Sequence, residues 1–262
     1  MQPPDMETLT IERDGGTAFL YMDRPDKRNA MNHTMFNELG VAAQYVSDEP
    51  EIKVLIITGR GSAFSAGLDF GAMGGFMDVT VTDFRTIVRK MQRNFRAFEL
   101  LEKPVIAMVN GPALGAGTEI ALACDMILAS SEAVFGLLEV NLGLVTDLGA
   151  TRRLPRQIGI HRARELIMAG KKIDAAEADR IGMVNAVYPP EELFGQAMTL
   201  ARHLEGLSPV AVGLCKICID RCFDGSVEAG LEQEAQAQSI CMAHVIEEMK
   251  RGAPEQQGGG GA

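Results

Sequence analysis

Two short apolar runs, each followed by a glycine-containing turn and then by a helical pattern, constrain the fold of this 262-residue chain most strongly. Residues 54–57 form a β-branched run that ends at Gly59, and residues 105–109 form a second run that turns at 110–112. Uninterrupted apolar runs are typical of strands that are buried on both faces, as in parallel sheets covered by helices. The order of these segments therefore predicts an α/β fold in which strand units alternate with helices.

The remaining periodicities extend this prediction along the chain. Residues 8–13 and 17–22 flank Asp14-Gly15-Gly16, which predicts a β-hairpin. Residues 32–46 carry one apolar helical stripe, and Asn32 is a candidate N-cap. Further helices are expected at 83–102, 118–123, 162–168, 175–181, 191–204, 209–222 and 227–249, with strands at 126–129 and 184–188. The second half is therefore predicted to be mostly helical.

Composition limits the partners that such a chain can have. Hydrophobic residues make up 47% and charged residues 23%, which is ordinary for a globular protein. Twenty-five basic against 35 acidic residues give a formal charge of −10, which repels phosphate backbones and anionic lipid, so neither nucleic acid nor a membrane is expected as a partner. No apolar run approaches the roughly 18–20 residues of a membrane span, and Asp5 and Glu7 stand where a secretory signal would be apolar. A cytoplasmic location is expected.

Cysteine spacing offers one candidate metal site. Cys215, Cys218 and Cys222 lie three and four residues apart, the spacing of one helix face, and only His203 and His244 lie near them in sequence. A metal site would need thiolates and a fourth ligand at the spacing of a loop. Buried thiols and no metal site are therefore expected.

Two loops with small residues follow the two apolar runs. The first covers residues 64–69, Phe-Ser-Ala-Gly-Leu-Asp, and the second covers residues 111–117. Small residues let backbone N–H groups face a ligand, and two such groups from different loops would form an oxyanion hole. The alternative is that the glycines only make tight turns. The glycines at 111, 115 and 117 lack the spacing of a dinucleotide-binding fingerprint.

Two glutamates stand among apolar residues. Glu119 lies in the apolar opening of a predicted helix, and Glu139 is flanked by Leu138 and Val140. A carboxyl group in apolar surroundings tends to have a raised pKa, which suits proton transfer near neutral pH. The alternative is that either glutamate forms an ion pair with an arginine such as Arg152 or Arg153.

Four ordered segments carry a resemblance to a known family. Residues 25–31, 63–69, 103–119 and 135–143 resemble, in this order, the signature segments of the crotonase (enoyl-CoA hydratase/isomerase) superfamily. The resemblance covers residues 6–251. It implies an α/β fold, a spiral of ββα units in residues 6–205, followed by a helical trimerisation region in residues 206–251, and an assembly that is a homotrimer or a homohexamer. The glycine-rich residues 252–262 have nothing to bury and are expected to be disordered.

The resemblance also implies a mechanism. Members of the family bind an acyl-CoA thioester and stabilise the enolate that forms at its oxygen, so CoA is part of the substrate and no separate cofactor is expected. The two backbone donors of the oxyanion hole correspond to Leu68 and Ala116, where alanine replaces a common glycine. The acid and base of the hydratases correspond to Glu119 and Glu139, which implies hydration of a 2-enoyl-CoA.

The substrate contacts follow from the same resemblance. CoA would lie against the turn at 28–30 and the segment 63–68, where Lys27 or Arg28 could meet a phosphate group. A solvated basic loop is the alternative for these two side chains. By residue type alone, and not from the resemblance, Phe70, Met73, Phe76 and Met77 are candidates to line an acyl pocket, because methionines adapt to varied apolar shapes. The expected substrate-binding residues are Lys27, Arg28, Ala30, Ala66, Asp69 and Gly115.

Asp147 opens two alternatives. It follows Glu139 by eight residues, and this spacing is similar to that of the dienoyl-CoA isomerases, which use a Glu and an Asp to move a proton along a conjugated chain. Those isomerases carry Asp where this chain has Glu119, so hydration is favoured. The alternative without catalysis is that Asp147 caps a helix that starts near residues 148–151. A scaffold that binds acyl-CoA without turnover would be expected to lack the glutamates, which are present.

Overall fold

The computed structural model describes residues 2–71 and 79–252, which form two compact units. The first unit ends at Leu207 and the second begins at Ser208. Most of the glycine-rich tail lies outside the described residues, as do the pocket candidates Met73, Phe76 and Met77.

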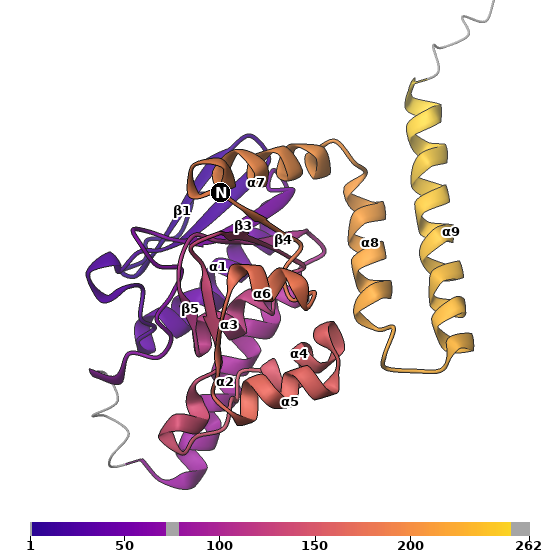
Figure 1. Ribbon diagram of the computed structural model, residues 1–262. Helices are drawn as coiled ribbons and strands as arrows, with labels where there is room; N and C mark the ends of the chain where they lie inside the picture. Colours follow the sequence, from indigo (N-terminus) through magenta and orange to yellow (C-terminus); the bar gives the residue numbers. More distant parts are fainter. Residues whose placement is uncertain (1, 72–78, 253–262) are drawn as a thin grey trace, which may run out of the picture. The chain divides into compact units, whose positions relative to one another are not determined.

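A six-stranded sheet forms the centre of the first unit (Figure 1). The predicted hairpin is present, because β1 and β2 pair antiparallel around Asp14–Thr17. The following strands all join in parallel, as the apolar runs predicted. In spatial order the strands are β1 (Leu9–Asp14), β2 (Thr17–Met22), β3 (Val54–Gly59), β4 (Val105–Val109), β6 (Met126–Ser130) and β9 (Ala186–Tyr188).

Both faces of the sheet are buried. Leu55 and Ile57 of β3 belong to the main core, which also contains the apolar stripe of α1 (His33–Asp48). Val54 and Ile56 point to the opposite face and pack in a second cluster with α7 (Pro190–Glu205). Figure 1 shows α7 along one side of the sheet and α1 on the other. The prediction of a strand buried on both faces is confirmed.

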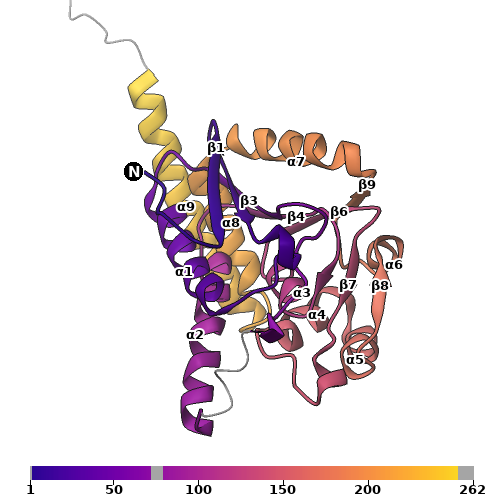
Figure 2. The same ribbon diagram turned by 90° about the vertical axis from the view of Figure 1, so that its left-hand side faces the viewer.

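A smaller, three-stranded sheet lies on the side of the large sheet away from α7 (Figure 2). It contains β5 (Ala113–Leu114), β7 (Val134–Gly136) and β8 (Lys172–Asp174). The chain passes from β4 to β5 and then into α3 (Ala116–Ala121), and from β6 to β7. These two turns of the chain each supply one strand to each sheet, which confirms the α/β spiral of ββα units. The sequence did not predict β5, β7 or β8, because two or three residues are too few to show a period; β9 is as short, but it lies within the longer segment 184–188.

The helices begin and end close to the predicted positions. Asn32 caps α1, since its side-chain oxygen accepts a hydrogen bond from the N–H of Met35 at 2.9 Å. The helix α2 (Val81–Glu99) ends three residues before the predicted end, and only its C-terminal part is buried, through Phe95 and Phe98. The other helices of this unit are α4 (Ala150–Ile158), α5 (Ile160–Met168) and α6 (Ala175–Arg180).

A buried asparagine ties the first signature segment to the second. Asn29 is fully buried and adopts a left-handed backbone conformation, with φ of 55°. Its side-chain amide group donates hydrogen bonds to the carbonyl oxygens of Arg60 at 2.9 Å and Ala63 at 2.8 Å. The hydroxyl group of Ser65 donates in turn to the carbonyl oxygen of Asn29 at 2.8 Å. The turn at 28–30 is therefore held directly against the loop that begins at residue 63.

The second unit consists of α8 (Pro209–Asp220) and α9 (Val227–Gly252). The expectation of buried thiols is wrong here, because Cys215 and Cys222 are exposed and Cys218 is half-buried. One neighbouring helix in this unit cannot cover all sides of α8. Several large apolar side chains of α9 are exposed: Leu231, Ile240, Met242, Val245, Ile246 and Met249. Among the described residues, no helix is long and apolar enough to cross a membrane.

Candidate active site

The two glycine-containing loops lie side by side. The N–H of Ser65 donates to the carbonyl oxygen of Pro112 at 3.1 Å, and the N–H of Leu114 donates to the carbonyl oxygen of Ser65 at 2.9 Å. Gly67 has φ of +88°, and a Cβ atom there would lie 2.5 Å from the carbonyl oxygen of Leu114. Gly67 thus makes a turn and also permits the close approach of the two backbones. The two interpretations of the loop glycines, tight turns and access to backbone N–H groups, are therefore compatible.

The N–H groups of Leu68 and Ala116 are the donors that this packing brings together. The carbonyl group of Gly67 belongs to the same peptide group as the N–H of Leu68, and it accepts a hydrogen bond from the N–H of Met31 at 2.7 Å. Because a trans peptide group points its C=O and N–H in opposite directions, the N–H of Leu68 faces away from Met31. Ala116 is the first residue of α3, where N–H groups have no partner within the helix.

Geometry places these two N–H groups next to each other. A Cβ atom on Gly67 would lie 3.5 Å from the backbone nitrogen of Ala116. Within residues 2–71 and 79–252, neither the N–H of Leu68 nor that of Ala116 donates a hydrogen bond. Both donors are therefore available to a ligand.

Glu119 is buried, with 1% of its surface exposed, and is held by the start of α4. Its Oε1 accepts hydrogen bonds from the N–H groups of Leu148 at 2.9 Å and Ala150 at 3.1 Å. Burial is the main cause that raises the pKa of Glu119 to about 8. The hydrogen bonds from Ala150 and Leu148 oppose this shift, and the negative charges of Glu139 and Asp147 support it. Glu119 is thus protonated near neutral pH and can donate a proton.

Glu139 lies next to Gly115 of the second glycine-containing loop. It begins the short 3-10 helix η3 (Glu139–Leu142) and is half-buried. Its Oε2 accepts a hydrogen bond from the hydroxyl group of Thr146 at 3.0 Å. Gly115 has φ of +52°, and a Cβ atom there would lie 2.8 Å from Glu139 Oε1. Gly115 therefore leaves room for this carboxylate, one residue before Ala116.

The two glutamates do not form the ion pairs that the sequence left open. Arg153 instead bonds Glu99 and the carbonyl oxygen of Leu148. In the described part of the chain, no ion pair joins an arginine to Glu119 or Glu139. The interpretation that an arginine neutralises either glutamate is wrong, because the buried carboxyl group is satisfied by backbone N–H groups.

Asp147 lies between η3 and α4, close enough to both glutamates for electrostatic coupling. Burial, and next the negative charge of Glu139, raise the pKa of Asp147. The N-cap residue of α4 is Gly149, which has no side chain that could bond the first turn. The interpretation of Asp147 as a cap is therefore wrong, since Glu119 occupies that position. The side chain of Gln92 on α2 donates to the carbonyl oxygen of Asp147 at 2.7 Å.

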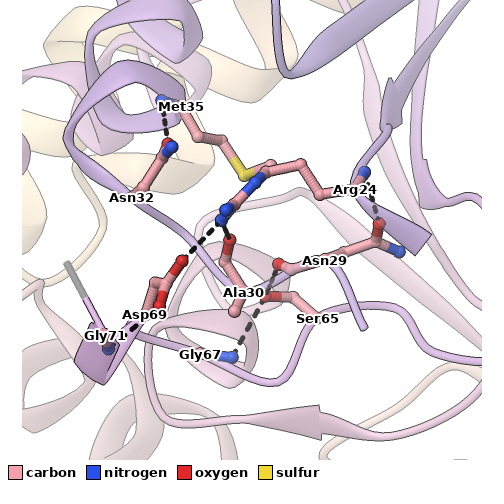
Figure 3. Close-up of polar contacts among 9 residues, drawn as sticks. All are labelled: Arg24, Asn29, Ala30, Asn32, Met35, Ser65, Gly67, Asp69 and Gly71. Carbon is pink, nitrogen blue, oxygen red and sulfur yellow. Dashed lines mark hydrogen bonds and ion pairs between the residues drawn. The ribbon is translucent and has the colours of Figure 1, made fainter. Parts of the chain in front are cut away.

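The expected CoA-binding segments are adjacent. The N–H of Ala66 donates to the carbonyl oxygen of Arg28 at 2.8 Å, and Lys27 and Arg28 expose their side chains beside this contact. Asp69 makes an ion pair with Arg24, and Arg24 also donates to the carbonyl oxygen of Ala30 (Figure 3). Phe70 is 55% exposed at the end of the described segment.

Sequence reasoning missed Arg24 and Thr146. Arg24 stands directly before the first signature segment, and Thr146 stands directly before Asp147. Only their positions next to these residues could have indicated a role, because a hydrogen bond to a distant backbone or side chain produces no periodic pattern in the sequence.

Comparisons with known proteins agree with this geometry. The family model described as enoyl-CoA hydratase/isomerase matches residues 12–253. The crotonyl-CoA hydratase of Syntrophomonas wolfei is 38% identical over 90% of this chain and 90% of its own length. The structure of an enoyl-CoA hydratase from Bacillus anthracis has a TM-score of 0.84 and 33% identity, with coverage of 89% of this chain and 90% of that chain.

A further structure was determined with bound CoA. This protein, from Thermobifida fusca, is 28% identical to the chain and has a TM-score of 0.86. The match covers 94% of this chain and 99% of that chain. Fold, site and sequence therefore agree on the class of protein. The chain belongs to the enoyl-CoA hydratase/isomerase family, the crotonase superfamily.

Replacement of Glu119 by Gln is expected to flatten the pH dependence of stability. The pKa of Glu119 is about 8 in the folded protein against an ordinary value of 4.5, so the folded state holds an extra proton between these pH values. The resulting stability is fully present below pH 4.5. It is lost as the pH rises through 8, by at most about 1.4 kcal/mol per pH unit.

Glutamine can accept the same two N–H bonds but does not titrate. In urea unfolding at pH 6 to about pH 9, we expect the Glu119→Gln protein to gain stability relative to wild type as the pH increases. Glu132→Gln, at an exposed position, should keep the wild-type slope. Equal slopes for wild type and Glu119→Gln would contradict the prediction.

Proposed function

We propose that this protein hydrates a 2-enoyl-CoA to the 3-hydroxyacyl-CoA. The observation that carries the proposal is the arrangement of Glu119 and Glu139 beside the two available N–H groups of Leu68 and Ala116. The name of the Syntrophomonas relative, a crotonyl-CoA hydratase, supports the same reaction. A retained pair of glutamates also argues against a scaffold that binds acyl-CoA without turnover.

The thioester carbonyl oxygen would accept hydrogen bonds from the N–H groups of Leu68 and Ala116. When water adds to the β carbon, electrons move to this oxygen and an enolate forms. Donors that are already oriented stabilise this charge without reorganisation, an effect worth about 10²–10³-fold in rate for each donor. The exposed Lys27 and Arg28 are suited to a phosphate group of CoA, which the bound CoA of the Thermobifida relative supports as a ligand class.

Each glutamate has one oxygen engaged and one oxygen left for the reaction. Backbone N–H groups hold Oε1 of Glu119, so its Oε2 remains. Thr146 holds Oε2 of Glu139, so its Oε1 remains beside Gly115. Glu139 would take the proton of the attacking water, and protonated Glu119 would give its proton to the α carbon. Return of one proton from Glu139 to Glu119 restores the starting state.

Isomerisation of a dienoyl-CoA is the second candidate function. Asp147 favours it, because it is half-buried, electrostatically coupled to Glu139, and eight residues further along the chain. In this reaction Glu139 and Asp147 would move a proton between carbons of a conjugated chain. Glu119 would then take no part in the proton transfer.

The assembly proposed for the protein is a homotrimer or homohexamer. The exposed apolar residues of α9 support association through the second unit, because contiguous apolar surface is rarely left open to water. The cytoplasmic location stays a prediction.

Glu139→Gln is expected to lower kcat for hydration by at least about 10²-fold. The amide group cannot take a proton from water, whereas its size and its hydrogen bond from Thr146 are retained. Binding of CoA, measured by calorimetry, should change little. A kcat close to that of wild type would contradict the role of Glu139.

Asp147→Asn is expected to leave most of the hydration of a short 2-enoyl-CoA intact. The measurement is a panel of 2-enoyl-CoA and 3,5-dienoyl-CoA substrates, followed by loss of the conjugated thioester absorption and by product mass. Hydration adds one water to the mass and isomerisation adds nothing. If Asp147 carries a transferred proton, the variant should instead lose about 10²–10⁴-fold in isomerisation. Faster conversion of a dienoyl-CoA than of any 2-enoyl-CoA by wild type would overturn the hydratase proposal.

The particle in solution is expected to be three or six times the chain mass of 28.2 kDa. Light scattering at micromolar concentration measures this mass directly. Replacement of Ile240 and Met242 of α9 by Asp should shift the particle toward the monomer, while Val41→Asp, at an exposed apolar position of α1, should not. A wild-type mass of one chain would refute the assembly.

A further inference from the structure

We propose that Arg24 is a positioning residue that orients and strengthens the oxyanion donor Leu68 through a chain of two hydrogen-bonded peptide groups. This inference rests on the proposed function, because it explains why one of the two N–H groups that would bind the thioester oxygen is a strong hydrogen-bond donor. Arg24 lies outside that contact and would act only through the backbone.

The chain of hydrogen bonds can be followed atom by atom. Arg24 Nη1 donates to the carbonyl oxygen of Ala30, which shares its peptide group with the N–H of Met31 (Figure 3). That N–H donates at 2.7 Å to the carbonyl oxygen of Gly67, which shares its peptide group with the N–H of Leu68. A guanidinium group therefore stands at one end of the chain, and the N–H of Leu68 stands at the other.

The direction of every dipole in this chain is the same. A cation at the carbonyl end of a peptide group polarises it so that its N–H becomes a better donor, and linked hydrogen bonds reinforce one another. Charge-assisted hydrogen bonds are also stronger than neutral ones. Arg24 thus increases the positive potential at the N–H of Leu68, where negative charge develops in the reaction.

Asp69 keeps the guanidinium group in place. Its Oδ2 lies 2.9 Å from Arg24 Nη1, and the two side chains are 18% and 20% exposed. Its Oδ1 accepts a hydrogen bond from the N–H of Gly71 at 3.1 Å, so both oxygens are engaged. The backbone N–H of Asp69 donates to Met31 at 3.0 Å, which holds the residues on both sides of Leu68 against Met31.

This arrangement gives Asp69 contacts within the protein that the sequence did not predict. The sequence predicted Asp69 as a residue that contacts the substrate. Its carboxylate forms an ion pair with Arg24 and accepts a hydrogen bond from the N–H of Gly71, and the contact with substrate stays a prediction. We assign it to the support of Arg24.

The experiment compares Arg24→Met, Arg24→Gln and Arg24→Lys with wild type. Two quantities are measured for each: kcat and KM for hydration of a short 2-enoyl-CoA, and the fraction of bound acetoacetyl-CoA present as enolate, from its absorption band. The enolate fraction reports the strength of the oxyanion donors and needs neither water nor proton transfer to carbon. Arg202→Met is the matched control, because Arg202 also forms ion pairs, with Asp14 and Glu205.

We expect Arg24→Met to lower kcat by about 10-fold to 100-fold. This decrease does not exceed the decrease in kcat expected when a whole oxyanion donor is removed. The enolate fraction should fall in parallel, with little change in KM. Lys can supply both a charge and a donor, and Gln can supply only a neutral donor. Arg24→Lys should therefore retain more enolate than Arg24→Gln, and Arg202→Met should match wild type.

Several results would overturn the proposal. One is a wild-type enolate fraction in Arg24→Met, or in Arg24→Gln if Arg24→Met does not fold. Another is a loss confined to KM, which would indicate a contact with the substrate. A wild-type protein that forms no enolate would also overturn it. If wild type binds the enolate but hydrates no 2-enoyl-CoA, the proposed function fails while the chain from Arg24 to Leu68 stands, so the two failures are distinguishable.

Discussion

The close contact between the loop at 65–68 and the loop at 112–116 is the constraint on which the site depends. Reciprocal hydrogen bonds between Ser65 and its partners bring the two backbones together, and Gly67 lies where a Cβ atom would collide with the carbonyl oxygen of Leu114. Only this approach places the N–H groups of Leu68 and Ala116 beside each other. The two sheets position the contact, since the loops follow β3 and β4 of the large sheet and the second loop contains β5 of the small sheet.

A second constraint is the complete burial of one acidic side chain, Glu119, beside two half-buried ones, Glu139 and Asp147. A buried carboxylate is costly unless it is protonated or well hydrogen-bonded, and the structure uses both solutions. Glu119 has a pKa of about 8 and two backbone donors, whereas Glu139 is half-buried with a hydroxyl donor from Thr146. Neighbouring acids in different surroundings can take different parts in one proton-transfer reaction. The fold gives the two glutamates different surroundings. Glu119 is buried against the N-terminus of α4, whereas Glu139 lies beside Gly115.

Much of the fold could be predicted from local patterns, and the errors have a common cause. The apolar runs at 54–57 and 105–109 predicted parallel strands, because burial on both faces requires apolar residues at every position. The strands β5, β7 and β8 were missed, since two or three residues without a longer apolar segment around them show no period. The thiols of α8 were predicted to be buried from helical spacing alone, yet spacing does not say which face has a neighbour.

The sequence by itself determined which residue types stand at the site: glycines at 67 and 115, glutamates at 119 and 139, and an aspartate at 147. Tertiary structure decided how they are used. It placed the backbone of Leu148 and Ala150 on Glu119, Thr146 on Glu139, and Arg24 at the start of the chain of hydrogen bonds that ends at Leu68. The physical reason is that a hydrogen bond depends on distance and direction between atoms of distant segments. Residue identity alone does not contain that information.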